Sequence, residues 1–319
     1  MRGIRGVRQM LYQLFSDTPA SVKIIFLLVL AATSYLIITY IGLLLALPLF
    51  SMNWDQLQYT ISEGFQKSDT GFIYYLQGIQ TLGIFIVPAL LAHILLFEQG
   101  SGFIKDRSLG IGTSVFLSLI VLIVSAPILQ WLIHWNNEIR FPDIMKGIES
   151  SLKKMENDRS AVTERLLSDR SIHVFLINIL IVAALPALGE EFMFRGVLQK
   201  ILISWFKNNH WGILVVAFCF SAFHLQFYGL IPRFLLGMFF GYLYCWSGTI
   251  WLPVLAHFLN NAIAISIAYI SMASDSQIPA LLTGNDNPTL PVLFVSFALT
   301  CILIICIRRY LLNLNREMG

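Results

Sequence analysis

The chain of 319 residues is 57% hydrophobic and only 12% charged. A soluble domain of this length carries about twice that charged fraction, so the composition excludes an ordinary soluble protein. The net charge of +3 fits contact with the inner leaflet of a membrane, and we expect no nucleic-acid partner.

Apolar runs predict about eight membrane-spanning helices. Five of the runs approach or exceed the roughly 20 residues that cross a bilayer as a helix, and three are shorter and more irregular. In chain order the runs are Ile24–Phe50, Gly71–Phe97, Leu109–Trp135, Ile172–Leu188, Trp211–Phe223, Phe234–Gly248, Ile250–Ala273 and Leu290–Ile307. We therefore predict an all-α fold, a polytopic transmembrane helix bundle that forms a single transmembrane domain over residues 1–319.

The basic residues favour one orientation in the membrane. With eight spans, Arg2, Arg5 and Arg8 lie on the same side as Arg308 near the C-terminus. Cytoplasmic loops are enriched in Lys and Arg, so both termini are predicted in the cytoplasm and the protein in the cell membrane. The seven basic residues of the segment 138–170 fall on the other side and weaken this assignment, so the side on which a pocket opens stays undecided.

The segment 138–170 is the main polar stretch between the spans, with seven acidic and seven basic residues. Its apolar residues recur mostly at three- and four-residue steps, which is the pattern of an amphipathic helix. They are Ile144, Ile148, Leu152, Met155, Val162 and Leu166. We predict one extramembrane amphipathic helix that caps the bundle or lies on the membrane; a gate over a pocket is the alternative.

Two adjacent glutamates occur directly after the fourth apolar run, in the stretch GEEFMFRGVLQK at 189–200. An ionisable residue among packed membrane helices is costly, so it is a functional candidate by default. Glu191 and Arg195 are four residues apart and are predicted to form a salt bridge. Glu190 points about 100° away from Glu191 and is the predicted functional carboxylate. A buried ion pair that only fixes helix packing is the alternative.

Later spans carry polar side chains that could meet Glu190. His224 follows Phe220 by four residues near the end of the fifth predicted span. His257 and Asn261 share one face of the seventh. The fourth and fifth spans are joined by a turn and are expected to run antiparallel. Glu190 and His224 lie at similar numbers of residues from this turn, so they reach similar depths in the membrane. Hydrogen bonds that only hold helices together would also explain these residues.

A carboxylate, two histidines and an amide are enough to hydrolyse a peptide bond. Glu190, helped by His224, could take a proton from a water molecule that attacks a carbonyl. His257 and Asn261 could donate hydrogen bonds to the resulting oxyanion. A zinc site of Glu190, His224 and His257 is the competing interpretation. The chain has no HExxH motif, the usual way to place two zinc histidines on one helix.

Three short motifs in this order resemble the signature of a family of membrane proteases. They are Glu190-Glu191-x-x-x-Arg195, Phe220-x-x-x-His224 and His257-x-x-x-Asn261. The family is that of the CAAX-processing and bacteriocin-immunity proteases, known as CPBP or Abi, which includes the type II CAAX prenyl endopeptidases. The resemblance covers Ala184 to Ile265, about a quarter of the chain.

The resemblance implies a role for each matching position. Glu190 and His224 are expected to activate water, and His257 and Asn261 to stabilise the oxyanion. Supporting positions are expected at Glu191, Arg195 and Phe220. The glutamate mechanism of the family needs no metal, so no cofactor is expected, with zinc as the alternative.

The leading hypothesis is an intramembrane glutamic-type endopeptidase that cleaves a membrane-associated peptide or protein, which could be lipidated and CAAX-like. Its partners would be membrane lipid and that substrate. A non-catalytic membrane scaffold or bacteriocin-immunity protein is one alternative, and a zinc-dependent version of the same protease is another. A proton-coupled transporter with Glu190 as carrier ranks below these, because the sequence shows no detectable inverted repeat. The sequence does not define the oligomeric state.

Overall fold

The computed structural model describes residues 12–63, 68–98, 110–139, 142–169, 171–273 and 287–317. Across these ranges the regular structure is helical, without strands. Seven helical stretches are long and apolar enough to cross a membrane, and an eighth, α11 (Asn209–Phe223), is apolar but shorter. The seven are Ala20–Leu49, Thr70–Leu96, Ile111–Asn137, Ile172–Phe206, Phe227–Ser247, Trp251–Ser271 and Leu290–Arg316. The predicted all-α, multi-pass membrane protein is confirmed.

Part of the predicted orientation rests on the N-terminal Arg2, Arg5 and Arg8, which lie outside the described residues. Residues 140, 141 and 170 of the predicted amphipathic segment also lie outside them. The cytoplasmic location of both termini therefore stays a prediction.

The chain folds into two compact units, each made from two separate stretches of sequence. Unit 1 comprises Met1–Ile104 and Leu180–Gly212, and unit 2 comprises Lys105–Ile179 and Ile213–Gly319. Because the units alternate along the chain, this division does not cut it into sequential domains. The single-domain organisation stays a prediction.

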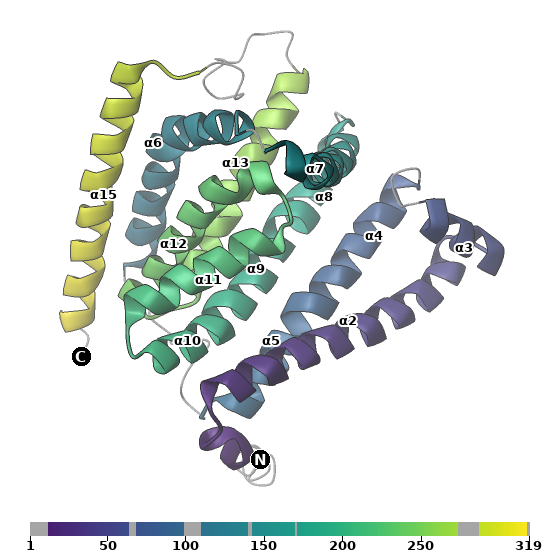
Figure 1. Cartoon of the computed structure of the whole chain (residues 1–319), viewed down its shortest axis with the longest axis horizontal. Helices are drawn as coiled ribbons and strands as arrows, with labels where there is room; N and C mark the ends of the chain where they lie inside the picture. Colours follow the sequence, from purple (N-terminus) through teal and green to yellow (C-terminus); the bar gives the residue numbers. More distant parts are fainter. Residues whose placement is uncertain are drawn as a thin grey trace. The chain divides into compact units, whose positions relative to one another are not determined.

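Unit 1 packs the long helix α2 against two later stretches of the chain. In Figure 1, α2 runs beside α4 and α5, and α10 also contacts α2. The stretch from α9 through η5 packs on η2 and α5. The bounds are α2 (Ala20–Leu49), α3 (Trp54–Glu63), α4 (Thr70–Thr81), η2 (Leu82–Ile86), α5 (Val87–Leu96), α9 (Leu185–Glu191), η5 (Phe192–Leu198) and α10 (Gln199–Phe206). The segments η2 and η5 are π-helical.

Glycines allow the helices of unit 1 to approach each other closely. A Cβ atom at Gly83 would lie only 3.2 Å from the Cα of Tyr35 in α2. A Cβ atom at Gly189 would lie 3.0 Å from the Cβ of Phe85 in η2. Small residues at such contacts are typical of membrane helices, which associate through close van der Waals packing because lipid is as apolar as their side chains.

Unit 2 has a core of apolar side chains between α6 (Ile111–Asn137), α12 (Leu230–Ser247), α13 (Trp251–Ala273) and α15 (Leu290–Glu317). Polar side chains of α15 add hydrogen bonds to backbone carbonyls of its neighbours. Ser296 Oγ donates to the carbonyl of Val124 over 2.6 Å. Asn315 Nδ2 donates to the carbonyl of Trp246 over 2.5 Å. These bonds satisfy polar groups that lipid could not hydrate.

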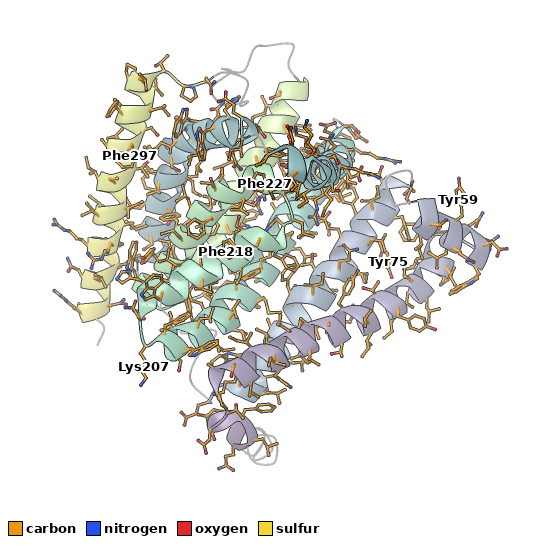
Figure 2. All side chains as sticks on the ribbon, viewed as in Figure 1. Tyr59, Tyr75, Lys207, Phe218, Phe227 and Phe297 are labelled. Carbon is orange, nitrogen blue, oxygen red and sulfur yellow. The ribbon has the colours of Figure 1, made fainter. Side chains whose placement is uncertain are left out.

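Large apolar side chains are exposed on many helices of both units. Figure 2 labels three of them: Tyr59 is 64%, Phe218 55% and Phe297 61% exposed. Soluble monomers rarely expose contiguous apolar patches of large area. Outward-facing apolar side chains along spans of this length are the expected surface of a protein in contact with lipid.

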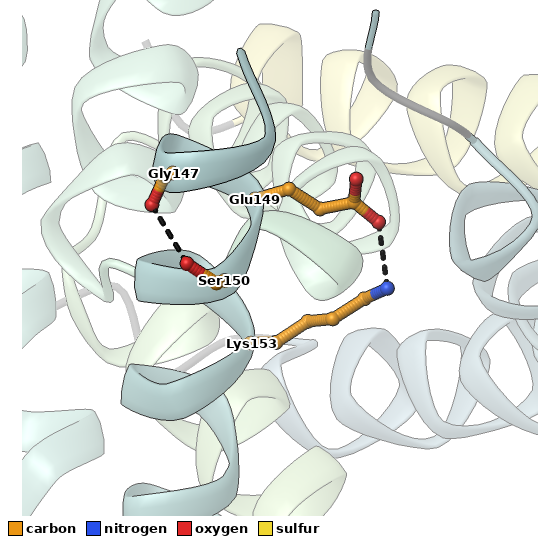
Figure 3. A network of polar contacts seen from close by, with 4 residues as sticks. All are labelled: Gly147, Glu149, Ser150 and Lys153. Atoms are coloured by element: carbon orange, nitrogen blue, oxygen red, sulfur yellow. Dashed lines mark hydrogen bonds and ion pairs between the residues drawn. The ribbon is translucent and has the colours of Figure 1, made fainter. Parts of the chain in front are cut away.

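The predicted amphipathic helix is present as α7 (Lys146–Leu167) in unit 2, preceded by the short 3-10 turn η3 (Asp143–Met145). Its polar side carries local contacts, which Figure 3 shows. Glu149 Oε1 accepts from Lys153 Nζ over 2.6 Å, and Ser150 Oγ donates to the carbonyl of Gly147 over 2.9 Å. An i,i+4 pair such as Glu149–Lys153 stabilises an exposed helix slightly.

The apolar stripe of α7 is buried unevenly. Leu166 at its C-terminal end is 3% exposed, whereas Ile144 before the helix is 94% exposed and Ile148 53%. Asn178 Nδ2, from α8 (Ile172–Asn178), donates to the carbonyl of Leu166 over 2.8 Å. Leu152 and Val162 of the predicted stripe are half-buried, so the stripe is fully buried only at Leu166.

Candidate active site

The first polar motif lies in the long helical stretch Ile172–Phe206. Within it, α9 ends with Glu190 and Glu191 and is preceded by the π-helical segment η4 (Ile179–Ala184) and followed by η5. Pro186 lies at the junction of η4 and α9, inside the continuous helical stretch, where its missing N–H removes one backbone hydrogen bond. Short π-helical segments inside α-helices occur frequently at functional sites. The helix geometry thus supports the choice of this motif as a functional candidate.

Glu191 and Arg195 form a buried salt bridge in unit 1. Arg195 Nη1 lies 2.8 Å from Glu191 Oε1, and both side chains are 0% exposed. The salt bridge that the four-residue spacing predicted is therefore present. Because a lone charge in such surroundings would be very unfavourable, each of the two side chains is needed to neutralise the other.

The side chain of Glu190 is also largely enclosed, with 8% exposure. It lies within electrostatic reach of Arg195, which therefore acts on both glutamates. The missing side chain of Gly189 lets α9 pack closely against Phe85 and Thr81, and this contact holds the backbone next to Glu190 in place. The carboxylate of Glu190 thus lies on a tightly packed helix, near the buried guanidinium of Arg195.

The second motif holds His224 at the end of α11 in unit 2. Its ring nitrogen Nδ1 lies 2.9 Å from the backbone carbonyl of Phe220. A carbonyl oxygen can only accept a hydrogen bond, so Nδ1 carries a proton and, in the neutral ring, Nε2 is the proton acceptor. This tautomer leaves Nε2 suited to take a proton from water.

The second and third motifs are neighbours in unit 2. The ring of Phe220 contacts His224 edge-on, with centroids 5.2 Å apart, and His257 in the same way at 5.7 Å. Phe240 from α12 stacks on His257 at 5.0 Å with an interplanar angle of 18°. His257 is 5% exposed. The sequence singled out Phe220 through its motif, but it gave no signal for Phe240.

Asn261 lies one helical turn beyond His257 on α13. Its Oδ1 accepts a hydrogen bond from Nδ2 of Asn260 over 3.2 Å. This bond fixes the amide so that Nδ2 of Asn261 points to the other side, as a hydrogen-bond donor. Helical periodicity directs Asn260 about 100° away from Asn261, yet in the fold its amide bonds to that of its neighbour.

The candidate residues fall into two groups. Unit 1 holds Glu190, Glu191 and Arg195, and unit 2 holds Phe220, His224, His257 and Asn261. The meeting of the two groups stays a prediction. Within either unit, the described His, Cys, Asp and Glu side chains form no cluster of three that could hold a metal ion. A zinc site of Glu190, His224 and His257 would need ligands from both units.

The middle of the chain matches a known family. Residues 172–263 match the model of the family described as Type II CAAX prenyl endopeptidase Rce1-like. This region is similar to that family. It contains all three motifs, from Glu190 to Asn261, so the resemblance inferred from them is confirmed over this stretch.

Two curated bacterial proteins are similar to the chain. The uncharacterized protein YpbD of Bacillus subtilis (strain 168) is 29% identical over 125 residues, which are 38% of this chain and 57% of that protein. An uncharacterized 24.3 kDa protein of Escherichia coli is 32% identical over 97 residues, 29% of this chain and 45% of that protein. The chain thus spans about half the length of these relatives. No solved structure matches it.

Proposed function

We propose that the chain is an intramembrane endopeptidase of the glutamic type, which hydrolyses a peptide bond in a membrane-associated substrate. The observation that carries the proposal is the pair of polar groups inside one Rce1-like region. One group sets Glu190 beside the Glu191–Arg195 salt bridge, and the other sets His224 and His257 around Phe220.

The proposed mechanism requires Glu190 to meet the histidines. Glu190 and Nε2 of His224 take a proton from a water molecule, whose oxygen attacks the carbonyl carbon of the scissile bond. His257 and Nδ2 of Asn261 donate hydrogen bonds to the oxyanion that forms. The proton is then delivered to the leaving amine, and the C–N bond breaks. No covalent intermediate with the protein is needed.

The remaining residues of the motifs would hold this constellation in place. Arg195 neutralises Glu191 and acts electrostatically on Glu190. Phe220 supplies both the carbonyl that orients His224 and a ring that contacts His224 and His257. Preorganised donors and bases of this kind are usually the largest contribution to catalysis.

The proposed function also implies a location, a metal requirement and a substrate class. We propose a cell-membrane protein with both termini in the cytoplasm, which works in contact with lipid and needs no metal. The substrate class is a membrane-bound peptide or protein, with lipidated, CAAX-like C-termini as the first candidates. A zinc-dependent version of the same hydrolysis would use Glu190, His224 and His257 as ligands, since that set leaves an open position for water.

The test is cleavage of quenched membrane peptides, including a prenylated CAAX peptide, by detergent-purified protein. Glu190→Gln is compared with wild type and with Glu164→Gln, a control at an exposed position on α7. We expect Glu190→Gln to abolish cleavage, and both the control and a chelator to leave it intact. Chelator-sensitive cleavage that zinc restores would replace the metal-free mechanism with the zinc one. Cleavage unchanged in Glu190→Gln would refute the proposal. Peptide binding without cleavage by wild type would favour the non-catalytic scaffold.

A further inference from the structure

The backbone directly after His224 adopts an unfavourable conformation. Leu225 has a φ of 52°, in the left-handed region where the side chain of any residue but glycine crowds the carbonyl. Such conformations persist when the surrounding structure holds them, and they concentrate at functional sites. The question is therefore which groups hold the turn that follows His224.

Side chains from two helices of the unit 2 core hold the first two residues after Leu225. Arg233 of α12 donates from Nη2 to Gln226 Oε1 over 2.7 Å and from Nη1 to the carbonyl of the same residue over 3.3 Å. Asn136, at the end of α6, donates from Nδ2 to the carbonyl of Phe227 over 2.7 Å. Asn136 is only 2% exposed, so this bond is made inside the protein.

The third contact comes from the amphipathic helix α7. Glu156 Oε2 accepts a hydrogen bond from the backbone N–H of Tyr228 over 3.3 Å. Tyr228 belongs to the short 3-10 turn η6 (Phe227–Gly229), and α7 packs on both η6 and α13, the helix of His257. Three successive residues after Leu225 are thus each held by a side chain of a different helix.

The helix that carries Glu156 is itself anchored. Its C-terminal end is fixed by the burial of Leu166 and by the hydrogen bond from Asn178 to the carbonyl of that residue. Glu156 is half-buried, unlike the exposed Glu164 farther along the same helix. Because α7 is anchored, the carboxylate of Glu156 keeps its position and can restrain the turn after His224.

We propose that Glu156, Asn136 and Arg233 are positioning residues for His224. Through Glu156, the amphipathic helix α7 sets the geometry of the histidine instead of only covering the bundle. This inference rests on the proposed function, in which Nε2 of His224 takes a proton from water. The helix α7 then contributes to catalysis by positioning His224, although none of its residues contacts the reacting atoms.

The test compares Glu156→Ala with Glu156→Gln, with Glu164→Ala as the matched control on the same helix. The backbone N–H of Tyr228 needs only an acceptor, which the amide oxygen of glutamine still offers. In Glu156→Ala we expect the amides of residues 225–228 to exchange with deuterium about tenfold faster, as one lost hydrogen bond predicts. Glu156→Gln should stay close to wild type, and Asn136→Ala should behave like Glu156→Ala.

Two further readouts link the turn to His224. The first is kcat, which should fall by about tenfold in Glu156→Ala while KM changes by less than about twofold, because the geometry of the base changes and substrate binding does not. The second is the rate at which diethyl pyrocarbonate modifies His224, measured by mass spectrometry, which should rise in the same variant. This labelling does not depend on any cleavage activity.

Each outcome decides between distinct explanations. Exchange and labelling unchanged in Glu156→Ala would overturn the inference, whatever the cleavage assay shows. If Glu156→Gln changed amide exchange and kcat as much as Glu156→Ala does, the inference would also be overturned. The lost negative charge near Arg159 and Arg233, and not the lost hydrogen-bond acceptor, would then cause the change. A rise in KM alone would make α7 a gate for substrate. If wild type cleaves nothing, the proposed function fails, while exchange and labelling still test the positioning.

Discussion

Removing the cation of the buried salt bridge should destabilise the protein strongly. Arg195→Met would leave the carboxylate of Glu191 without the guanidinium that lies 2.8 Å away, at a position with 0% side-chain exposure. Breaking a buried pair in this way costs about 3–5 kcal/mol, since one buried charge remains without compensation. Glu191→Leu combined with Arg195→Met removes both charges of the salt bridge and should recover part of that loss, since only the weaker effect of Arg195 on Glu190 stays lost. The expected coupling between the two sites is at least about 2 kcal/mol.

The measurement is the free energy of unfolding in mixed detergent, followed by tryptophan fluorescence and circular dichroism for both single variants and the double variant. Lys153→Met is the matched control, because Glu149 and Lys153 have the same spacing and a distance of 2.6 Å, but solvent reaches both side chains, with the lysine 47% and the glutamate 15% exposed. An exposed pair contributes about 0–1 kcal/mol. The reasoning is refuted if Arg195→Met costs no more than this control, or if the double variant loses the sum of the single losses.

Four other outcomes follow from the structure. Gly189→Ala should lose about 1–3 kcal/mol of stability, because its Cβ would lie 3.0 Å from the Cβ of Phe85. Gly112→Ala, with nothing within 4 Å of its added Cβ, should instead gain up to about 1 kcal/mol in the same unfolding assay. Lys207→Gly should also stabilise, by up to about 1 kcal/mol, because Lys207 ends α10 with a left-handed φ of 50°; a loss in thermal denaturation would contradict this. Phe240→Ala should cost about 3–5 kcal/mol and release the ring of His257, which a faster reaction of His257 with diethyl pyrocarbonate would reveal.

Local spacing in the sequence determined much of this protein. Apolar runs long enough to cross a bilayer must be helical, because lipid offers no partner to an open backbone. The helical repeat then assigns residues to faces, and this was enough to predict the Glu191–Arg195 salt bridge and the helix α7. It also placed His224 one turn after Phe220, the distance at which its ring reaches the Phe220 carbonyl.

Only the tertiary structure decided which of these faces meet. Phe240 stacks on His257 from another helix, and Glu156 and Asn136 reach the turn after His224 from segments more than 60 residues away in sequence. The same is true of the apolar stripe of α7, which is fully buried only at Leu166, where Asn178 of α8 bonds to the backbone. The period of a helix sets the direction of each side chain within that helix, whereas the neighbour that it contacts depends on the packing of the whole unit.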